Sequence, residues 1–429
     1  MLTGWSRPER LRKMSLEHRK ATRKVKVTNK AGQAMANTKL TLRQTNHKFL
    51  FGCGAFDFVM YTLSQDKKAF EMIPEQFRPD TGLLQKKIDQ WLAVYNYGTL
   101  PFYWGRFEHE EGKPNTEGLL NTAKFMQGKG VTVKGHPLCW HTACVDWLMN
   151  YDNETIMRKQ LDRITREVTN FKGVIDFWDV INEVVIMPIF DKYDNAITRI
   201  CNEYGRIGLI RKVFAQAREA NPDATLLLND FNTSISYEIL VDGCLNAGVT
   251  IDAIGIQSHQ HQGYWGAAKV EEVLKRFEHF GKPIHFTENT LISGDLMPAD
   301  IVDLNDWQVP EWPSTPEGEE RQRREMEEMY RILFEHPLVE AITGWDFTDG
   351  AWLGAPSGVL RKDGSPKPAY EMLKDLIRSE WWTVEDVTTD EEGYVTLTGF
   401  KGDYELTDGT DTIALSLREN SDETETIVL

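Results

Sequence analysis

Two short apolar segments of the chain each end in a glutamate. Residues 177–183 read Phe-Trp-Asp-Val-Ile-Asn-Glu, and residues 283–288 read Pro-Ile-His-Phe-Thr-Glu. Segments of this type are typical of buried parallel strands, whose carboxyl ends meet at one edge of a sheet. Two carboxyl groups at such an edge can divide acid–base and nucleophilic chemistry on a single bond. Glu183 and Glu288 are therefore the candidate catalytic pair.

The elements that position this pair recur eight times along the chain. We predict strands over residues 49–54, 95–102, 131–140, 174–183, 224–232, 251–259, 283–288 and 341–348, and helices over 84–95, 118–128, 155–171, 204–220, 236–248, 267–280, 316–336 and 368–380. Eight strand–helix units predict an α/β fold, a (β/α)8 TIM barrel whose active site lies at the carboxyl ends of the strands. A doubly wound open sheet would need a glycine-rich phosphate loop, which we do not find.

The two ends of the chain carry opposite charge and a different pattern. Residues 1–30 hold ten Lys and Arg against two Glu, and residues 383–429 hold thirteen Asp and Glu against one Lys and one Arg. Residues 1–20 read as a basic helix. Period-two alternation predicts strands at 25–28 and 40–44, which we expect to form a hairpin or edge pair, and at 393–400 and 412–418.

We predict that these terminal strands form a small accessory β-sandwich, in which the two ends partly neutralise each other. The predicted domains are residues 1–48 with the N-terminal helix and accessory strands, residues 49–382 with the catalytic barrel, and residues 383–429 with acidic strands that pack on the N-terminal segment. Whether this sandwich binds sugar or only supports the barrel is open.

The composition argues against several classes of protein. A formal net charge of -16 argues against nucleic-acid binding. No stretch approaches the length of a membrane span, and the N-terminus lacks the apolar core of a signal peptide, so we expect a cytoplasmic protein, or a secreted one if a signal peptide has been removed. Five scattered cysteines without a C-x-x-C pair indicate neither a disulfide scaffold nor a zinc ribbon. We expect no cofactor and no metal, and the oligomeric state is open.

Polar and aromatic side chains gather at the ends of the predicted strands. Besides the two glutamates they are His136, Trp140, His141, Asn182, Asn229, Asp230, Asn232, Gln257, Ser258, His259, Trp345, Asp346, Asp349 and Trp352. Buried polar groups must satisfy one another or a ligand, so these residues predict a binding site. In glycosidic cleavage one carboxylic acid protonates the leaving oxygen and the other carboxylate attacks the sugar or activates water. Asn182 could bond a sugar hydroxyl, and Trp345 and Trp352 could stack on the ring.

Several motifs resemble, in the same order, those of glycoside hydrolase family 10, the retaining endo-β-1,4-xylanases. They are WDVINE at 178–183, GHPLCWH at 135–141, LNDFN at 228–232, GIQSH at 255–259, FTE at 286–288, GWDFTD at 344–349 and KPAY at 367–370. The resemblance, which runs from about residue 49 to 382, implies that Glu183 is the acid/base and Glu288 the nucleophile of a double displacement on a carbohydrate. Retaining enzymes hold the two carboxyl groups about 5–5.5 Å apart. The resemblance also implies that the reacting sugar lies among His136, Trp140, Asn182, Gln257, His259, Trp345 and Trp352, and we place Asn229 in the same set.

Three segments depart from the family pattern. The family's Glu-Asn and Lys-Trp after the second strand are replaced by residues 99–105, Thr-Leu-Pro-Phe-Tyr-Trp-Gly, which put Tyr103 where Lys would precede Trp104. We expect both rings to reshape the glycone site, in favour of short oligosaccharides or a decorated glycoside. Thr290 follows the nucleophile where the family has an Asp that orients the strand-six histidine. An insertion at 291–315 is either a lid or binding wall, or a solvated decoration.

Two other functions stay open. A metal-dependent barrel hydrolase would use His259 and His261, whose H-x-H spacing points both side chains the same way on a strand, with Asp346 at the end of strand eight. That pair falls on strand six rather than the first strand, and the reading leaves Glu183 without a role. A non-catalytic carbohydrate-binding barrel would keep the fold, although both candidate glutamates are present.

Overall fold

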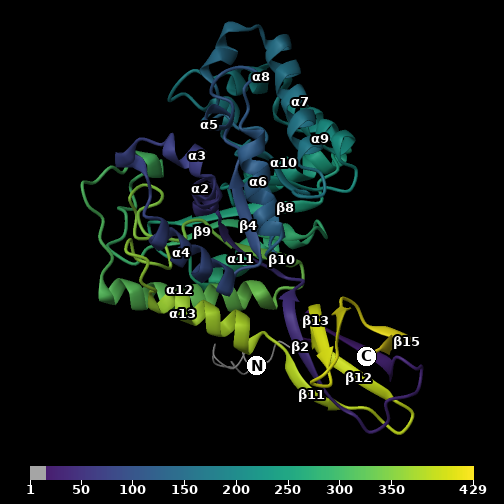
Figure 1. Ribbon diagram of the computed structural model, residues 1–429. Coiled ribbons are helices and arrows are strands. Elements are labelled where there is room, and N and C mark those ends of the chain that lie inside the picture. Colours follow the sequence, from purple (N-terminus) through teal and green to yellow (C-terminus); the bar gives the residue numbers. More distant parts are fainter. Residues whose placement is uncertain (1–15) are drawn as a thin grey trace, which may run out of the picture. The chain divides into compact units, whose positions relative to one another are not determined.

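The structure is a computed structural model that describes residues 16–429, apart from the side chain of Asp422 (Figure 1). One compact unit consists of Phe51–Tyr330 and Leu338–Glu371, and the other of the residues up to Leu50, Arg331–Pro337 and Met372–Leu429. In the part of the chain so described, no helix is both long and apolar enough to cross a membrane. Most of the predicted basic helix over 1–20 lies outside these residues; its end, Leu16–Arg19, is a 3-10 helix.

Eight strands close a barrel in the order β10-β3-β4-β5-β6-β7-β8-β9. They are β3 (Leu50–Gly54), β4 (Tyr97–Pro101), β5 (Thr132–His136), β6 (Phe177–Asn182), β7 (Thr225–Asp230), β8 (Ala253–Gln260), β9 (Ile284–Leu291) and β10 (Val339–Gly344). Neighbouring strands from β3 through β10 pair in parallel. Parallel strands buried on both faces need continuous apolar runs, which is the pattern that the sequence carries. The predicted TIM barrel is confirmed, and each predicted strand overlaps an observed one.

Helices alternate with these strands. They are α2 (Phe56–Gln65), α3 (Lys67–Glu71), α4 (Thr81–Val94), α5 (Trp104–Phe107), α6 (Thr116–Gln127), α7 (Asn153–Asn170), α8 (Ala196–Tyr204), α9 (Arg206–Ala220), α10 (Ile235–Asn246), α11 (Ala267–Glu278), α12 (Pro316–Glu335) and α13 (Pro368–Asp375). Aspartate side chains cap α4 and α7, where Asp80 and Asp152 accept from free backbone N–H groups. One helix predicted over 204–220 is preceded by a second, because Gly205 takes a φ of 69° that separates α8 from α9.

Two small sheets form the accessory sandwich. One has the order β12-β1-β15 and the other β11-β2-β13-β14. Their strands are β1 (Lys20–Thr28), β2 (Lys39–His47), β11 (Val384–Thr388), β12 (Tyr394–Phe400), β13 (Gly402–Thr407), β14 (Thr412–Leu417) and β15 (Ser421–Val428). The predicted hairpin or edge pair of β1 and β2 is wrong, since the two strands lie in different sheets. Alternation fixes which face of a strand is buried, but it does not name the neighbouring strand.

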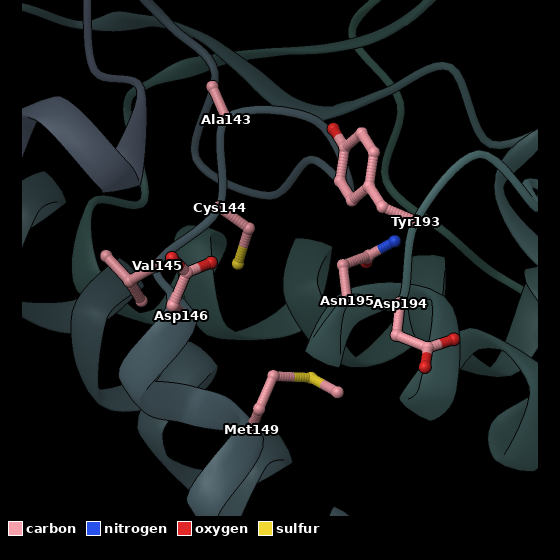
Figure 2. Close-up of a pocket in the computed structure, with 8 residues that line it drawn as sticks. All are labelled: Ala143, Cys144, Val145, Asp146, Met149, Tyr193, Asp194 and Asn195. Atoms are coloured by element: carbon pink, nitrogen blue, oxygen red, sulfur yellow. The ribbon is translucent and has the colours of Figure 1, made fainter.

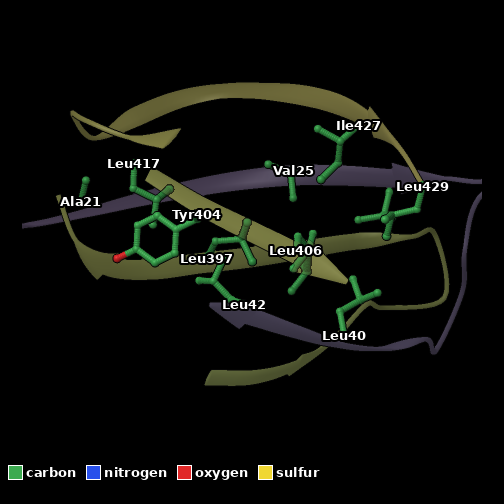
Figure 3. Packing of buried hydrophobic residues seen from close by; sticks show 12 residues of the cluster. Ala21, Val25, Leu40, Leu42, Leu397, Tyr404, Leu406, Leu417, Ile427 and Leu429 are labelled. Atoms are coloured by element: carbon green, nitrogen blue, oxygen red, sulfur yellow. The ribbon is translucent and has the colours of Figure 1, made fainter. Parts of the chain in front are cut away.

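Both ends of the chain contribute to the core of this sandwich (Figure 3). Its buried members are Ala21, Val25, Val27, Leu40, Leu42, Val395, Leu397, Tyr404, Leu406, Leu417, Ile427 and Leu429. Ion pairs at or near the surface also join the two ends, including Arg23–Glu425 at 2.5 Å and Lys30–Asp411 at 2.6 Å. Solvent-exposed pairs stabilise a fold by about 0–1 kcal/mol each, so the apolar core contributes most of the stability.

Candidate functional site

Glu183 follows directly after β6 in a strained backbone conformation. Its φ is +58°, in the left-handed region that residues with a side chain rarely adopt. Two backbone hydrogen bonds hold it there: its N–H donates to the Asn229 carbonyl at 2.9 Å, and the Met187 N–H donates to the Glu183 carbonyl at 3.2 Å. Such strain costs on the order of 1–3 kcal/mol and is concentrated at functional positions.

Three neutral groups donate hydrogen bonds to the carboxyl group of Glu183. Trp140 Nε1 donates to Oε2 at 2.9 Å, while Gln257 Nε2 and Asn182 Nδ2 donate to Oε1 at 3.1 and 3.2 Å. Removal from water disfavours the charged form and the nearby Glu288 carboxylate repels it, so the pKa of Glu183 rises to about 8 in spite of these bonds. Glu183 therefore carries a proton at neutral pH.

Imidazole rings surround the second carboxyl group. Glu288 lies within β9 and is 3% exposed. Asn229 Nδ2 donates to Oε1 at 2.8 Å, His259 Nε2 lies 3.1 Å from Oε2, and His136 Nδ1 lies 3.9 Å from Oε1. Burial by itself raises the pKa of Glu288, but the charges of His136 and His259 outweigh it, so the pKa falls below its usual value. Glu288 is therefore a carboxylate at neutral pH.

Amide groups link the two glutamates. Asn182 Oδ1 accepts from Asn229 Nδ2 at 2.8 Å and from Gln257 Nε2 at 3.0 Å. Asn229 Nδ2 also donates to Glu288, and Gln257 Nε2 also donates to Glu183. The predicted residues Asn182, Asn229 and Gln257 thus form one hydrogen-bond network with both carboxyl groups.

The Asn229 side chain depends on two residues outside the predicted set. Thr287 Oγ1 donates to Asn229 Oδ1 at 2.6 Å, which leaves the Nδ2 group of Asn229 for the network. A Cβ at Gly255 would lie 2.5 Å from Asn229 Oδ1, so the close approach of the amide to β8 requires glycine there.

A buried ion pair holds His136. Asp179, in the middle of β6, has its Oδ2 atom 2.7 Å from His136 Nδ1 and 2.7 Å from Lys134 Nζ, and both the lysine and aspartate side chains are fully buried. Burial alone raises the pKa of Asp179, but Lys134 and His136 outweigh it and lower the pKa. Sequence reasoning missed this pair. The available signal was the i, i+2 spacing of Lys134 and His136, which puts both side chains on one face of β5.

The two rings of the altered segment after β4 occupy different surroundings. The Tyr103 ring lies 5.7 Å from the His136 ring and 5.6 Å from the Trp140 ring, so it belongs to the site. Trp104 is only 5% exposed, and its indole N–H donates to Glu108 Oε2 at 3.0 Å. The structure thus brings Tyr103 against His136 and Trp140, whereas the indole N–H of Trp104 is bonded to Glu108, and its place in the site stays a prediction.

Thr290 takes the place of the carboxylate expected beside His259. Its hydroxyl lies 3.4 Å from His259 Nδ1 and 3.3 Å from His261 Nδ1, while His259 Nε2 lies 3.1 Å from Glu288 Oε2. Two predicted rings pack on the same imidazole: Trp352 lies 4.5 Å from it, and Trp345 lies 6.0 Å from it, between centroids. The predicted tryptophans therefore lie beside Glu288.

The side chains that a metal site would use are engaged separately. His259 bonds to Glu288, while Asp346 accepts a hydrogen bond from Ser357 Oγ. The His261 ring centroid is 6.1 Å from that of His259. Across residues 16–429, apart from the Asp422 side chain, no three His, Cys, Asp or Glu side chains gather as a metal-binding group would require.

A pocket of about 220 Å³ opens between the loops after β5 and β6 (Figure 2). Its lining residues are Ala143, Cys144, Val145, Asp146, Met149, Tyr193, Asp194 and Asn195, none of which belongs to the predicted site. The Tyr193 hydroxyl is close enough to Glu183 for that carboxyl to contribute to its raised pKa, after burial as the first cause.

Comparison with known proteins matches this geometry to one family. The model of glycosyl hydrolase family 10 matches residues 102–376. The anti-sigma-I factor RsgI6 of Acetivibrio thermocellus is 24% identical over 400 residues, which are 91% of this chain and 45% of that protein. Endo-1,4-beta-xylanase B of Thermotoga neapolitana is 26% identical over 295 residues, 65% of this chain and 78% of that protein. The chain thus spans less than half the length of the first relative.

Solved structures agree on the fold. The GH10 structure from Paenibacillus barcinonensis is 24% identical, with a TM-score of 0.60, and the match covers 77% of this chain and 95% of that one. Xylanase 10B from Thermotoga petrophila, solved with xylobiose, is 22% identical with a TM-score of 0.59 over 78% of this chain and 95% of that one. Because the family model spans most of the barrel and includes both strand-end glutamates, the chain belongs to glycosyl hydrolase family 10.

Proposed function

We propose that the chain is a retaining glycoside hydrolase that cleaves β-1,4-linked xylose units or a related plant glycoside. The observation that carries the proposal is the opposite shift of two linked carboxyl groups: the pKa of Glu183 is raised to about 8, whereas that of Glu288 is lowered. A double displacement needs one group that holds a proton and one that attacks as a carboxylate.

In the first step, the Glu288 carboxylate attacks the anomeric carbon while Glu183 donates its proton to the departing oxygen. This yields a covalent sugar ester on Glu288 and a free leaving group. The ester carries no charge, so the repulsion that helps to raise the pKa of Glu183 disappears. The pKa of Glu183 then falls, and the group can accept a proton from the water that hydrolyses the ester. Two inversions retain the configuration of the sugar.

The remaining side chains of the site would bind the reacting sugar. Trp345, Trp352 and Tyr103 supply apolar ring faces, on which the C–H faces of a sugar pack. His136, Trp140, Asn182, Gln257 and His259 supply polar atoms around the two carboxyl groups. Asn229 acts as a positioning residue, because its amide holds Glu288 and Asn182 together.

Hydrolysis of a panel of 4-nitrophenyl β-xylosides, β-glucosides and β-galactosides tests the proposal. We expect release of 4-nitrophenol from one of these, with a first sugar product of the β configuration by proton NMR. A first product of the α configuration, or equal rates for the parent and for both Glu183→Ala and Glu288→Ala, would exclude the mechanism. Binding of the sugars without hydrolysis would instead indicate a non-catalytic barrel.

We also propose that the protein acts in the cytoplasm. All five cysteines are free in the structure, which fits a reducing compartment. Fractionation of the producing cell with an antibody to the barrel tests this location. Recovery of the protein from the culture medium would contradict it.

A further inference from the structure

The insertion at 291–315 has a small core of its own. Ile292, Met297 and Trp312 are buried together with Ala355 from the segment after β10. Trp312 Nε1 also donates to the Asp295 carbonyl at 2.8 Å. These buried apolar contacts give the insertion a packed core, which favours a binding wall over a solvated decoration.

Hydrogen bonds attach this wall to the residues that follow β8. The Met297 N–H donates to the His261 carbonyl at 2.9 Å. Gln262 Nε2 donates to the carbonyls of Pro298 and Ile301, both at 2.8 Å. Both His261 and Gln262 directly follow β8, so the wall begins after β9 and crosses the end of the neighbouring strand.

Ion pairs connect the insertion to the loop after β6. Lys192, in the loop that begins with Glu183, lies 2.6 Å from Asp303 Oδ2 and 2.6 Å from Asp306 Oδ1. Both aspartates belong to one short turn, where the Asp303 side chain caps the 3-10 helix Leu304–Asp306. In the barrel, β7 and β8 lie between β6 and β9. The contact therefore connects the loop after β6 with the insertion after β9, and we call this connection across the ends of β7 and β8 the bridge.

The bridge lies across one of the two directions in which a sugar chain can leave the site. The two carboxyl groups of a retaining glycosidase flank the bond that is cleaved, so the chain crosses the line between Glu183 and Glu288. One end therefore points toward β7 and β8, and the other toward β10, β3, β4 and β5. The first direction is bridged through Lys192.

The opposite direction is narrowed by Tyr103. Its ring follows β4 and lies within 6 Å of the His136 and Trp140 rings, measured between centroids at 5.7 and 5.6 Å. This is also the ring on which we propose that the reacting sugar packs. The ion pair of Lys192 therefore restricts one direction, and the Tyr103 ring lines the other.

We propose that the active site takes short β-glycosides, such as di- and trisaccharides, and that the Lys192–Asp303–Asp306 contact sets this length limit. The inference rests on the proposed function, and it names the substrate class of that same site. Lys192 acts here as a specificity-determining residue that touches neither glutamate. The bridge excludes long chains by closing the rim above β7 and β8.

The length dependence of kcat/KM on xylobiose through xylohexaose tests the inference. An open cleft with many subsites gives values that rise steeply with chain length, because each added sugar binds. We expect the parent protein to show values that are flat or fall beyond xylotriose, and no rapid drop in the viscosity of long xylan. A steep rise to xylohexaose would overturn the inference and leave the proposed function intact. Failure on every xylo-oligosaccharide and aryl glycoside would remove the proposed function and this inference with it.

Variants of the bridge residues test whether the bridge limits the length of the substrate. We expect Lys192→Ala to raise kcat/KM on xylohexaose relative to xylobiose by about fivefold, the range of exposed ion pairs, with an unchanged rate on 4-nitrophenyl β-xyloside. Asp303→Asn with Asp306→Asn keeps the helix cap and should give the same change, with no further effect of Lys192→Ala in that background. Lys269→Ala is the matched control, since Lys269 is equally exposed at 39% and pairs with Glu272 away from the bridge. An unchanged length profile in Lys192→Ala would overturn the inference.

Discussion

Glu183 follows β6 and Glu288 lies within β9 of the same barrel, yet their surroundings differ in charge. Glu183 receives hydrogen bonds from an indole and two amides, all neutral. Glu288 has imidazoles beside it, with His136 and His259 both within 4 Å at 3.9 and 3.1 Å. Both carboxyl groups are withdrawn from water, which raises the pKa of each. His136, His259 and Lys134 lower the pKa of Glu288, whereas the carboxylate of Glu288 helps to raise that of Glu183. This difference supports the proposal that Glu183 is the proton donor and Glu288 the attacking group.

The largest expected effect follows from removal of Glu288. We expect Glu288→Ala to lower kcat on 4-nitrophenyl β-xyloside by at least roughly 10⁴-fold, because the substitution removes the carboxylate that forms the covalent ester. Added azide should enter the space of the carboxylate and attack the anomeric carbon directly, with an α-xylosyl azide as product. NMR of the product identifies the configuration, and Glu272→Ala, on an exposed helix face, serves as the control for substitution of a glutamate.

Glu183→Ala should have a smaller effect that depends on the leaving group. General acid catalysis contributes about 10²–10⁴-fold. We expect a loss of this size in kcat/KM for xylobiose, whose leaving oxygen needs a proton. For 2,4-dinitrophenyl β-xyloside, whose leaving group departs without one, the loss should stay below roughly tenfold. Equal losses of kcat/KM on both substrates would contradict the role of Glu183 as the proton donor.

The sequence predicts the barrel and the candidate catalytic pair because both depend on local patterns. Apolar runs that end in polar residues mark strands β6 and β9, and a closed parallel barrel brings their ends to one rim. Glu183, Glu288, Asn182 and Gln257 were therefore located from the sequence and lie in one network.

Contacts between residues far apart in the chain were not predictable in the same way. Trp104 and Tyr103 are adjacent, yet Trp104 bonds to Glu108 in its own segment, and only the fold brings the Tyr103 ring to His136 on the next strand. Buried and exposed residues alternate along β1 and β2 as predicted, but both strands pair with C-terminal strands. The alternation does not indicate which strand will be the partner. The contact of Lys192 with the insertion likewise joins exposed charges, which a single sequence offers in many combinations.

The pH dependence of kcat/KM follows from the two opposite shifts. Activity requires protonated Glu183 and ionised Glu288. We therefore expect a bell-shaped profile of kcat/KM with its alkaline limb near pH 8 and its acid limb below pH 4.5, the usual pKa of a glutamate.

The stability of the fold also depends on pH, and the two glutamates change it in opposite directions. Glu183, with a raised pKa, destabilises the fold as pH rises from about 4.5 toward 8, whereas the stabilisation from Glu288 is lost as pH falls through its lowered pKa. Rates and thermal unfolding, followed from acid pH well below 4.5 up to pH 9, measure both effects. An alkaline limb that persists in Glu183→Gln would contradict the assignment.

The smallest expected effect concerns a single donor to Glu183. Trp140 Nε1 donates to Oε2 at 2.9 Å, and this bond favours the charged form of the carboxyl. Trp140→Phe keeps an aromatic ring and removes the donor, so the pKa of Glu183 should rise and move the alkaline limb upward by about half a pH unit, as expected for one neutral hydrogen bond. Trp345→Phe is the matched control, because the Trp345 ring packs on His136 and His259. It should lower affinity for the sugar and leave the alkaline limb in place. If both variants moved the limb equally, general packing of the site would set the pKa of Glu183, and the neutral donors would not distinguish it from Glu288.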